Sequence, residues 1–202
     1  MAGIDKSFEI RRALSSVHRF MEPHQFEKVK FLTSCILKDG KIEAVCNITD
    51  IYEELKTKYS QQTQICCILR RILTTAKVNP DYVKEIPSFN LSVEFTGKGE
   101  QFPDLSFYET LIQVSDSLGD KWRSFANVLT DSERGLATAN IHSGIHLLQC
   151  LMRAGTISPD YEERSKEFLA HRLAKVGRND IAKKLSPEGK YKHIGYYKNL
   201  RK

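Results

Sequence analysis

The chain of 202 residues lacks the segments that carry proteins across or into membranes. No apolar run approaches the roughly 20 residues that span a bilayer, and the opening residues MAGIDKSFEIRR contain no apolar stretch like that of a signal peptide. The phosphate-binding and catalytic signatures G-x-x-x-x-G-K-[ST], G-x-G-x-x-G, H-E-x-x-H and G-x-S-x-G are also missing. We therefore expect a cytoplasmic protein that is not an enzyme, binds no cofactor and does not insert into a membrane.

A disulfide framework is absent too, because the five cysteines are odd in number and form no C-x-x-C pair. Free thiols in a reducing compartment are the expected state. Cys66 and Cys67 lie in the apolar stretch ICCILRRIL, where buried thiols behave as small hydrophobic side chains. Arg70 and Arg71 lie nearby, so redox sensitivity of these two thiols stays open.

Candidate metal ligands are few. His142 and His146 are four residues apart and could share one helix face, as two metal ligands do. Only Cys150, one turn further along, could join them. We interpret the pair as two polar histidines near a helix start and expect no metal site.

Helical periodicity is what the sequence does contain, in two long stretches. Apolar residues recur every three or four positions, which predicts one-sided helices that need partners to cover them. Asn79-Pro80 and Ser158-Pro159 are typical of an N-cap followed by proline at the first helical position. Between the stretches, residues 87–105 carry two glycines and two prolines and break the period, which predicts a linker.

These patterns predict an all-α protein made of two six-helix antiparallel bundles joined by a short linker. The expected parts are a first bundle at 1–89, a linker at 90–104, a second bundle at 105–187 and a basic tail at 188–202. The tail holds 5 basic and 1 acidic side chains. Its tyrosines and lysines could bind nucleic acid, which is the alternative function that the sequence leaves open.

The only tryptophan, Trp122, is followed at helical spacing by Phe125, Ala126 and Leu129. We expect it to begin the second helix of the second bundle and to point inward, because a large aromatic side chain anchors several helices at once. Leu173 belongs to a later apolar stripe and is expected in the same core.

The predicted helix at 24–37 has one phenylalanine too many for a single inward stripe. Phe31 lies about 140° around the helix from Phe26, which heads the inward stripe, so we expect Phe31 to face outward as a docking residue. Two alternatives stay open: the bundle buries Phe31 at the edge of the stripe, or Phe31 is core and Phe26 is not.

Several stretches resemble the death-fold family of interaction modules. SLGDKWRSFANVL, with the later FLAHRLAKVGRNDIAKKL, resembles a death domain over about residues 105–187. KFLTSCILKDGKIEAVCNITDIYEELKTK resembles a death effector domain over about residues 6–89. The order of the two modules is similar to that of the Fas-associated death-domain adaptors. One departure is that Asn79-Pro80-Asp81-Tyr82 stands where the family has Arg-x-Asp-Leu, so the arginine is missing.

The resemblance implies two six-helix modules that each bind their own kind and self-associate into oligomers or filaments. It implies a death-domain receptor or adaptor as one partner and a death-effector-domain initiator caspase as the other, in apoptosis or innate immunity. The interface residues that it implies in the first module are Phe31, Leu32, Glu43, Asp50, Glu53, Arg70, Arg71 and Asp81. Those that it implies in the second module are Asp116, Lys121, Arg123, Asn127 and Glu133.

Overall fold

A computed structural model describes residues 6–37, 41–87, 103–129 and 141–187. Every regular element in these ranges is helical and none is a strand, which confirms the predicted all-α class. The chain divides into two compact units, Met1–Leu105 and Ser106–Lys202. Most of the expected linker and the whole basic tail lie outside the described residues.

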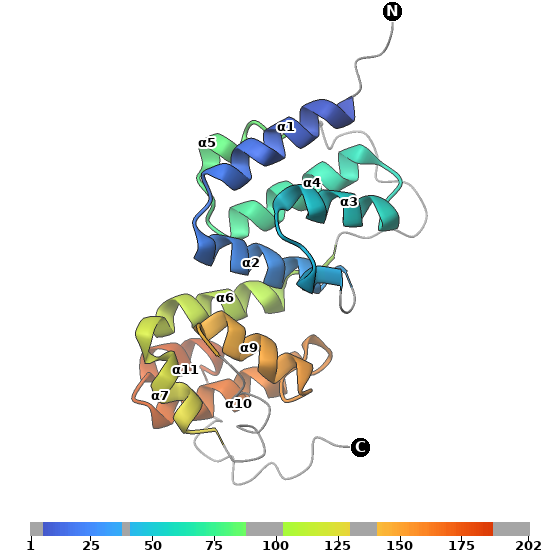
Figure 1. Ribbon diagram of the computed structural model, residues 1–202. Coiled ribbons are helices and arrows are strands. Elements are labelled where there is room, and N and C mark those ends of the chain that lie inside the picture. Colours follow the sequence, from blue (N-terminus) through green and yellow to red (C-terminus); the bar gives the residue numbers. More distant parts are fainter. Residues whose placement is uncertain (1–5, 38–40, 88–102, 130–140, 188–202) are drawn as a thin grey trace, which may run out of the picture. The chain divides into compact units, whose positions relative to one another are not determined.

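Within its described residues, the first unit contains five α-helices and one 3-10 turn (Figure 1). Helix α1 packs against α3 and α5, while α4 packs against α2, α3 and α5. The 3-10 turn buries Ile42. The elements are α1 (Lys6–Arg19), α2 (Pro23–Ser34), the turn Lys41–Glu43, α3 (Ile48–Lys58), α4 (Gln62–Thr75) and α5 (Pro80–Val83).

Side-chain hydrogen bonds cap the starts of α3 and α5. The Asn47 side chain accepts the backbone N–H of Asp50 at 3.0 Å, and the Asp50 carboxylate accepts the Asn47 N–H at 3.1 Å. This reciprocal pair satisfies two backbone N–H groups at the start of α3. Asn79 caps α5 through the Asp81 N–H at 2.9 Å, with Pro80 as the first helical residue, as predicted.

The core of the first unit follows the predicted apolar stripes. The three stripe residues of α1, namely Ile10, Leu14 and Val17, are fully buried. Burial of such side chains is the dominant favourable contribution to folding. The core residues of the other helices include Val29, Leu32, Ile51, Tyr52, Leu55, Ile65, Leu69, Ile72 and Leu73.

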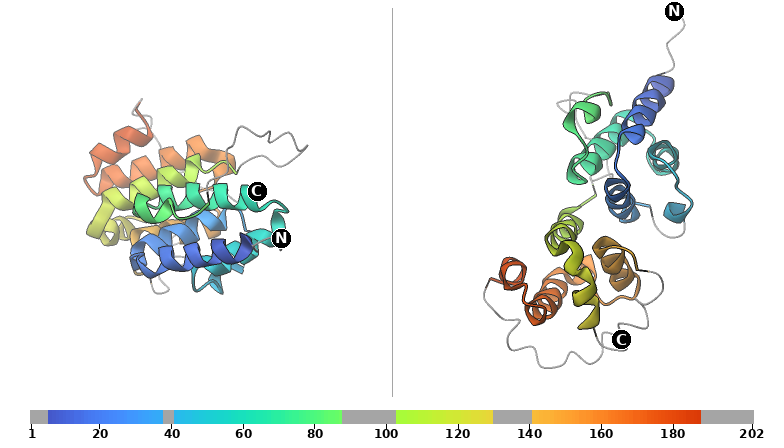
Figure 2. Two further views of the ribbon diagram at one scale, coloured as in Figure 1. Left: turned by 90° about the horizontal axis from the view of Figure 1, so that it is seen from above. Right: turned by 60° about the vertical axis from the view of Figure 1, so that its left-hand side comes forward.

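The described residues of the second unit also form a group of packed helices (Figure 2). Helix α9 packs against α6 and α7, and α10 packs against α11. Its core includes Leu111, Leu118, Phe125, Leu148 and Leu173. The described elements are α6 (Ser106–Leu118), a 3-10 turn (Gly119–Lys121), α7 (Trp122–Asn127), α9 (Gly144–Arg153), a 3-10 turn (Pro159–Tyr161), α10 (Glu162–Lys175) and α11 (Asn179–Leu185).

Two features of the second unit match the sequence in detail. The Ser158 hydroxyl accepts the Asp160 N–H at 3.2 Å ahead of the turn that begins at Pro159. Gly177 has a φ of +76° between α10 and α11, a left-handed conformation that glycine adopts without steric cost.

No helix among the described residues has both the length and the apolar composition to cross a bilayer.

Candidate protein-interaction surfaces

The expectation that Phe31 faces outward is wrong. Phe31 is 1% exposed and Leu32 is 0% exposed. Phe26 is instead half-buried, with its ring edge-on to His18 at 5.0 Å and the Lys30 ammonium 5.8 Å away. The physical reason is that α2 buries five residues from Lys28 to Thr33, which cover more than half of its circumference. A single narrow stripe is therefore too restrictive for this helix.

The acidic residues of α3 are held in local contacts. The Asp50 carboxylate also accepts the Cys46 N–H at 2.9 Å, so it serves the helix start. Glu53 bonds Arg11 of α1 at 2.9 Å and Lys56 at 3.1 Å. Burial alone would raise the pKa of Glu53, but the hydrogen bonds from Lys56 and Arg11 outweigh it and hold the pKa below its usual value.

The two adjacent arginines of α4 differ in what they do. Arg70 is half-buried, and its Nη1 donates to the backbone carbonyl of Ile86 at 2.7 Å. Arg71, the next residue, is exposed. Asp81 is exposed and pairs with Lys84 at 3.0 Å, while Glu43 is exposed in the 3-10 turn. Arg70 therefore stabilises the first unit, whereas the other three side chains lie at its surface.

The predicted charged residues of the second unit lie in one continuous segment. Asp116 is at the end of α6, Lys121 ends the following turn, and Arg123 and Asn127 belong to α7. All four are exposed. The structure thus brings together both signs of charge at the surface of α6–α7. Glu133 lies outside the described residues.

Trp122 begins α7, as predicted, but it is only half-buried. The Arg123 guanidinium lies 4.8 Å from the centre of its ring. The fully buried aromatic side chain of this helix is Phe125, one turn further on. Leu173 is fully buried, which confirms its place in the core. The expectation that Trp122 is the central anchor is therefore corrected in favour of Phe125.

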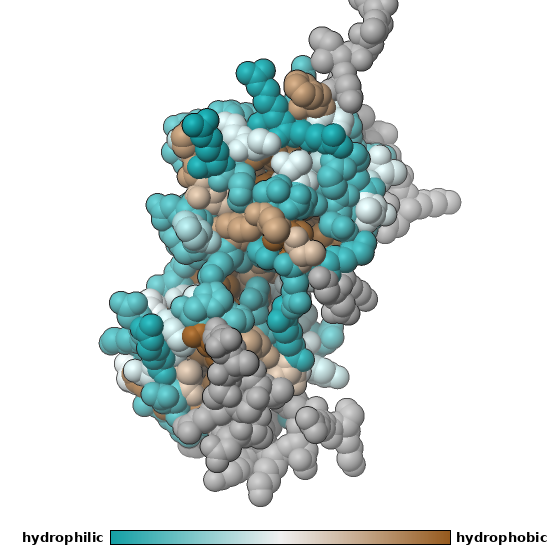
Figure 3. Space-filling model, in the orientation of Figure 1, coloured by the Kyte–Doolittle hydropathy of each residue, from teal (hydrophilic) through white to brown (hydrophobic). Residues whose placement is uncertain are grey.

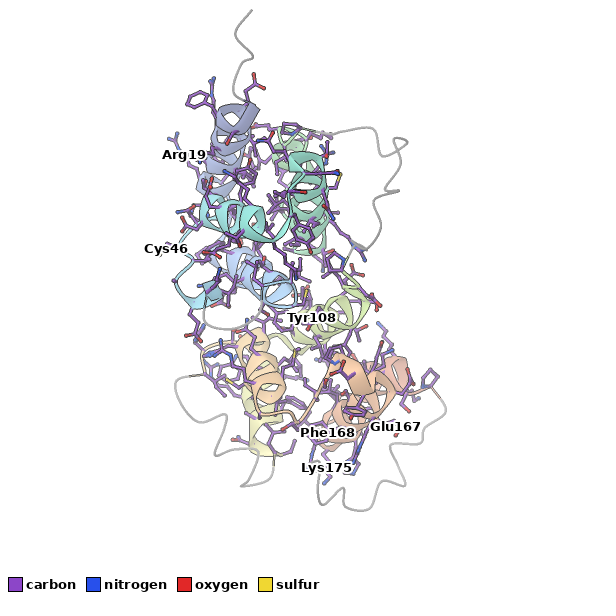
Figure 4. The ribbon with its side chains drawn as sticks, turned by 90° about the vertical axis from the view of Figure 1, so that its right-hand side faces the viewer. Arg19, Cys46, Tyr108, Glu167, Phe168 and Lys175 are labelled. Atoms are coloured by element: carbon purple, nitrogen blue, oxygen red, sulfur yellow. The ribbon has the colours of Figure 1, made fainter. Side chains whose placement is uncertain are left out.

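An exposed aromatic patch, which the sequence analysis missed, joins the end of α1 to α5. Phe20 is 53% exposed, and its ring stacks on that of Tyr82 with centroids 4.8 Å apart and planes 8° from parallel. The Arg19 guanidinium, labelled in Figure 4, lies 5.8 Å from the centre of the Phe20 ring. We call Arg19, Phe20 and Tyr82 the aromatic patch. Residue types of this kind are enriched at the centres of protein interfaces.

Among the described residues, other exposed aromatic side chains are few. Hydrophilic side chains cover most of the face drawn in Figure 3, with smaller groups of apolar ones between them. Phe8 of α1 is 67% exposed and Tyr161 is 64% exposed. Single exposed apolar residues are common on soluble proteins, so the stacked pair in the aromatic patch is the more informative feature.

A second missed contact holds α11 against α6. Arg178 donates from Nε and Nη2 to the Asp180 carboxylate at 2.9 Å and 2.7 Å, and from Nη1 to the carbonyl of Ser117. These bonds keep the pKa of Asp180 well below its usual range. The spacing of Arg178 and Asp180 in the stretch GRND is the sequence signal for this contact.

Burial lowers the reactivity of four cysteine thiols. Burial raises the pKa of Cys35 to about 12 and that of Cys66 to about 11. Burial also raises the pKa of Cys67 and Cys150, despite the nearby charges of Arg70 and Arg153 respectively. A thiol with a raised pKa is a poor nucleophile at neutral pH. The nearby arginine does not activate the Cys66-Cys67 pair.

Comparisons of this chain with protein-family models, with curated proteins and with solved structures found no match.

Proposed function

We propose that this protein is a non-enzymatic cytoplasmic adaptor whose two helical units each bind a protein of their own fold. In this proposal the first unit is a death effector domain and the second a death domain, in the order of the Fas-associated death-domain adaptors. The second unit binds a death-domain receptor or upstream adaptor. The first unit gathers death-effector-domain initiator caspases, in apoptosis or innate immune signalling.

The main support is the surface of α6–α7, where Asp116, Lys121, Arg123 and Asn127 are all exposed in one segment. Surfaces that carry both signs of charge suit association steered by complementary charge. The aromatic patch offers the first unit a small apolar anchor of the kind that dominates binding energy.

The mechanism rests on repetition of modest contacts. When an interface joins two different surfaces and does not close on itself, copies add one after another into an open assembly. Each added copy benefits from the high effective concentration of its neighbours, so weak single contacts give a stable assembly. An adaptor of this kind converts clustered receptors into clustered proteases.

The experiment uses full-length protein with a charge reversal in the second unit. Arg123→Glu should remove death-domain proteins from the material captured from a cell extract, as identified by mass spectrometry, while death-effector-domain proteins remain. Lys184→Glu makes the same charge change at an exposed position of α11 and serves as the matched control. Equal loss in both variants, or no loss in Arg123→Glu, would show that α7 is not the docking surface.

A parallel variant tests the first unit. Phe20→Ser should lower assembly in light scattering and leave the folded helix content unchanged, because Phe20 is exposed. Phe31→Asp is not suitable for this purpose, because it would place a charge at a buried position and disturb folding itself. Unchanged assembly in Phe20→Ser would remove the aromatic patch from the proposal.

A further inference from the structure

Two histidine rings face each other at the start of α9. His142 stands just before the N-cap residue Ser143, and His146 lies in the first turn of the helix. Their Nδ1 atoms are 3.0 Å apart, and their ring centroids are 4.4 Å apart with planes at 43°. At this distance one nitrogen donates and the other accepts, so at least one Nδ1 offers its lone pair toward the other ring.

The backbone between the two rings is held firmly. The Ser143 hydroxyl accepts the His146 N–H at 3.2 Å, which fixes the first turn of α9. Gly144 is seated so closely that an added Cβ would lie 3.1 Å from the Ser115 hydroxyl and 3.4 Å from the Trp122 Cβ. Both histidines therefore project from a segment that is packed against α6 and α7, and the approach of their rings is pre-organised.

The separation of the two nitrogens matches the spacing of two ligands on one metal ion. For an ion about 2.1 Å from each nitrogen, the 3.0 Å separation of the nitrogens gives an N–metal–N angle of about 90°. A tetrahedral site would require the nitrogens to move apart to roughly 3.4 Å. An angle near 90° is instead that of adjacent ligands in tetragonal coordination, which Cu²⁺ and Ni²⁺ prefer.

We propose that His142 and His146 form a two-histidine site for a divalent late transition-metal ion of tetragonal preference, with water in the remaining positions. His142 is exposed and His146 half-buried, so water has access to the open side. The ring that donates through Nδ1 moves that proton to its Nε2 on binding, which leaves both Nδ1 lone pairs for the ion. Binding weakens at acid pH because a protonated imidazole has no lone pair to offer.

Within the described ranges, no group of three or more His, Cys, Asp or Glu side chains could hold a metal ion. Cys150 lies one turn beyond His146, and burial raises the pKa of its thiol, which keeps it protonated. Among the described residues, the ligands of the proposed site are therefore the two imidazoles.

The only tryptophan gives a direct readout of binding. Gly144 stands between the two histidines in the sequence, and a Cβ added to it would lie 3.4 Å from the Trp122 Cβ. Paramagnetic Ni²⁺ at the site should quench its fluorescence in a saturable way with one equivalent per chain. The protein is full-length and carries no histidine tag, and Ni²⁺ is preferred to Cu²⁺ because it does not oxidise thiols. Circular dichroism checks that each variant remains folded.

His142→Gln and His146→Gln should each weaken Ni²⁺ binding by at least roughly 10- to 100-fold. Loss of an outer-shell partner of a metal site already has an effect of that size, and these variants remove a ligand itself. His142 is exposed and outside the helix, so its variant keeps the fold and the test stands even if His146→Gln is unstable. His171→Gln, the same change on α10, and Cys150→Ser should bind as the parent protein does.

Three results would overturn the proposal. The first is the absence of saturable quenching up to millimolar Ni²⁺. The second is a loss of less than about tenfold in His142→Gln. The third is an equal loss in Cys150→Ser, which would assign the ion to a thiolate. Saturable quenching that only the two histidine variants weaken supports the site.

Discussion

Arg70 offers a sharp test of how the first unit is held together, because its neighbour Arg71 is a matched control. The Arg70 guanidinium donates to the carbonyl of Ile86 at 2.7 Å, and Ile86 is fully buried. This bond ties α4 to the residues that follow α5, 16 positions along the chain. Arg70→Ala removes the donor and leaves the Ile86 carbonyl oxygen without this hydrogen bond.

The size of the effect follows from the partly buried position of Arg70. A hydrogen bond from a charged donor contributes about 1.5–3 kcal/mol, and water can reach part of this site, so we expect a loss of about 1.5 kcal/mol. For a domain of this size that loss lowers the unfolding midpoint by about 6–12 °C. Arg71→Ala changes an exposed residue whose interactions are screened by solvent, so it should cost less stability than Arg70→Ala.

The single tryptophan separates the two units in one experiment. Trp122 belongs to the second unit, so its fluorescence reports unfolding of that unit, while circular dichroism reports the helices of both. Arg70→Ala should lower the circular dichroism transition of the first unit and leave the fluorescence transition unchanged. Equal shifts in Arg70→Ala and Arg71→Ala, or a shift of the fluorescence transition, would refute this account of the Arg70–Ile86 bond.

Three further predictions concern other parts of the chain. Phe125→Ala should destabilise the second unit by about 3–5 kcal/mol, because the side chain is fully buried, and the fluorescence transition should show it. Asn47→Ala removes the cap of α3 and should cost about 1 kcal/mol in chemical denaturation, with little effect on the second unit. In native protein at pH 8, a thiol reagent should modify the exposed Cys46 well before Cys35 and Cys66, whose pKa values of about 12 and about 11 keep them protonated; labelling at equal rates would contradict this.

The helices themselves were predictable because their signals are local. Apolar spacing placed Ile10, Leu14 and Val17 on one buried face, and the Asn79-Pro80 pair marked a helix start. Trp122 was correctly predicted to begin a helix. Periodicity and capping depend on residues three or four positions apart, so a sequence contains this information without reference to any other part of the fold.

The candidate surfaces were less predictable, since exposure depends on what covers a side chain. The two phenylalanines of α2 exchanged places between prediction and structure, with Phe31 buried and Phe26 half-buried. The angle between them on the helix was correct. The width of the buried face was not, because helices distant in sequence determine how far around α2 the core extends.

The amino-acid sequence by itself determined the all-α class, the helix starts and most of the core, because these follow from short-range spacing. Only the tertiary structure decided which polar side chains serve the fold and which face solvent. Arg178 reaches the carbonyl of Ser117 across 61 positions, and Arg70 reaches the carbonyl of Ile86 across 16. Such contacts depend on how separate helices pack, which no local pattern specifies.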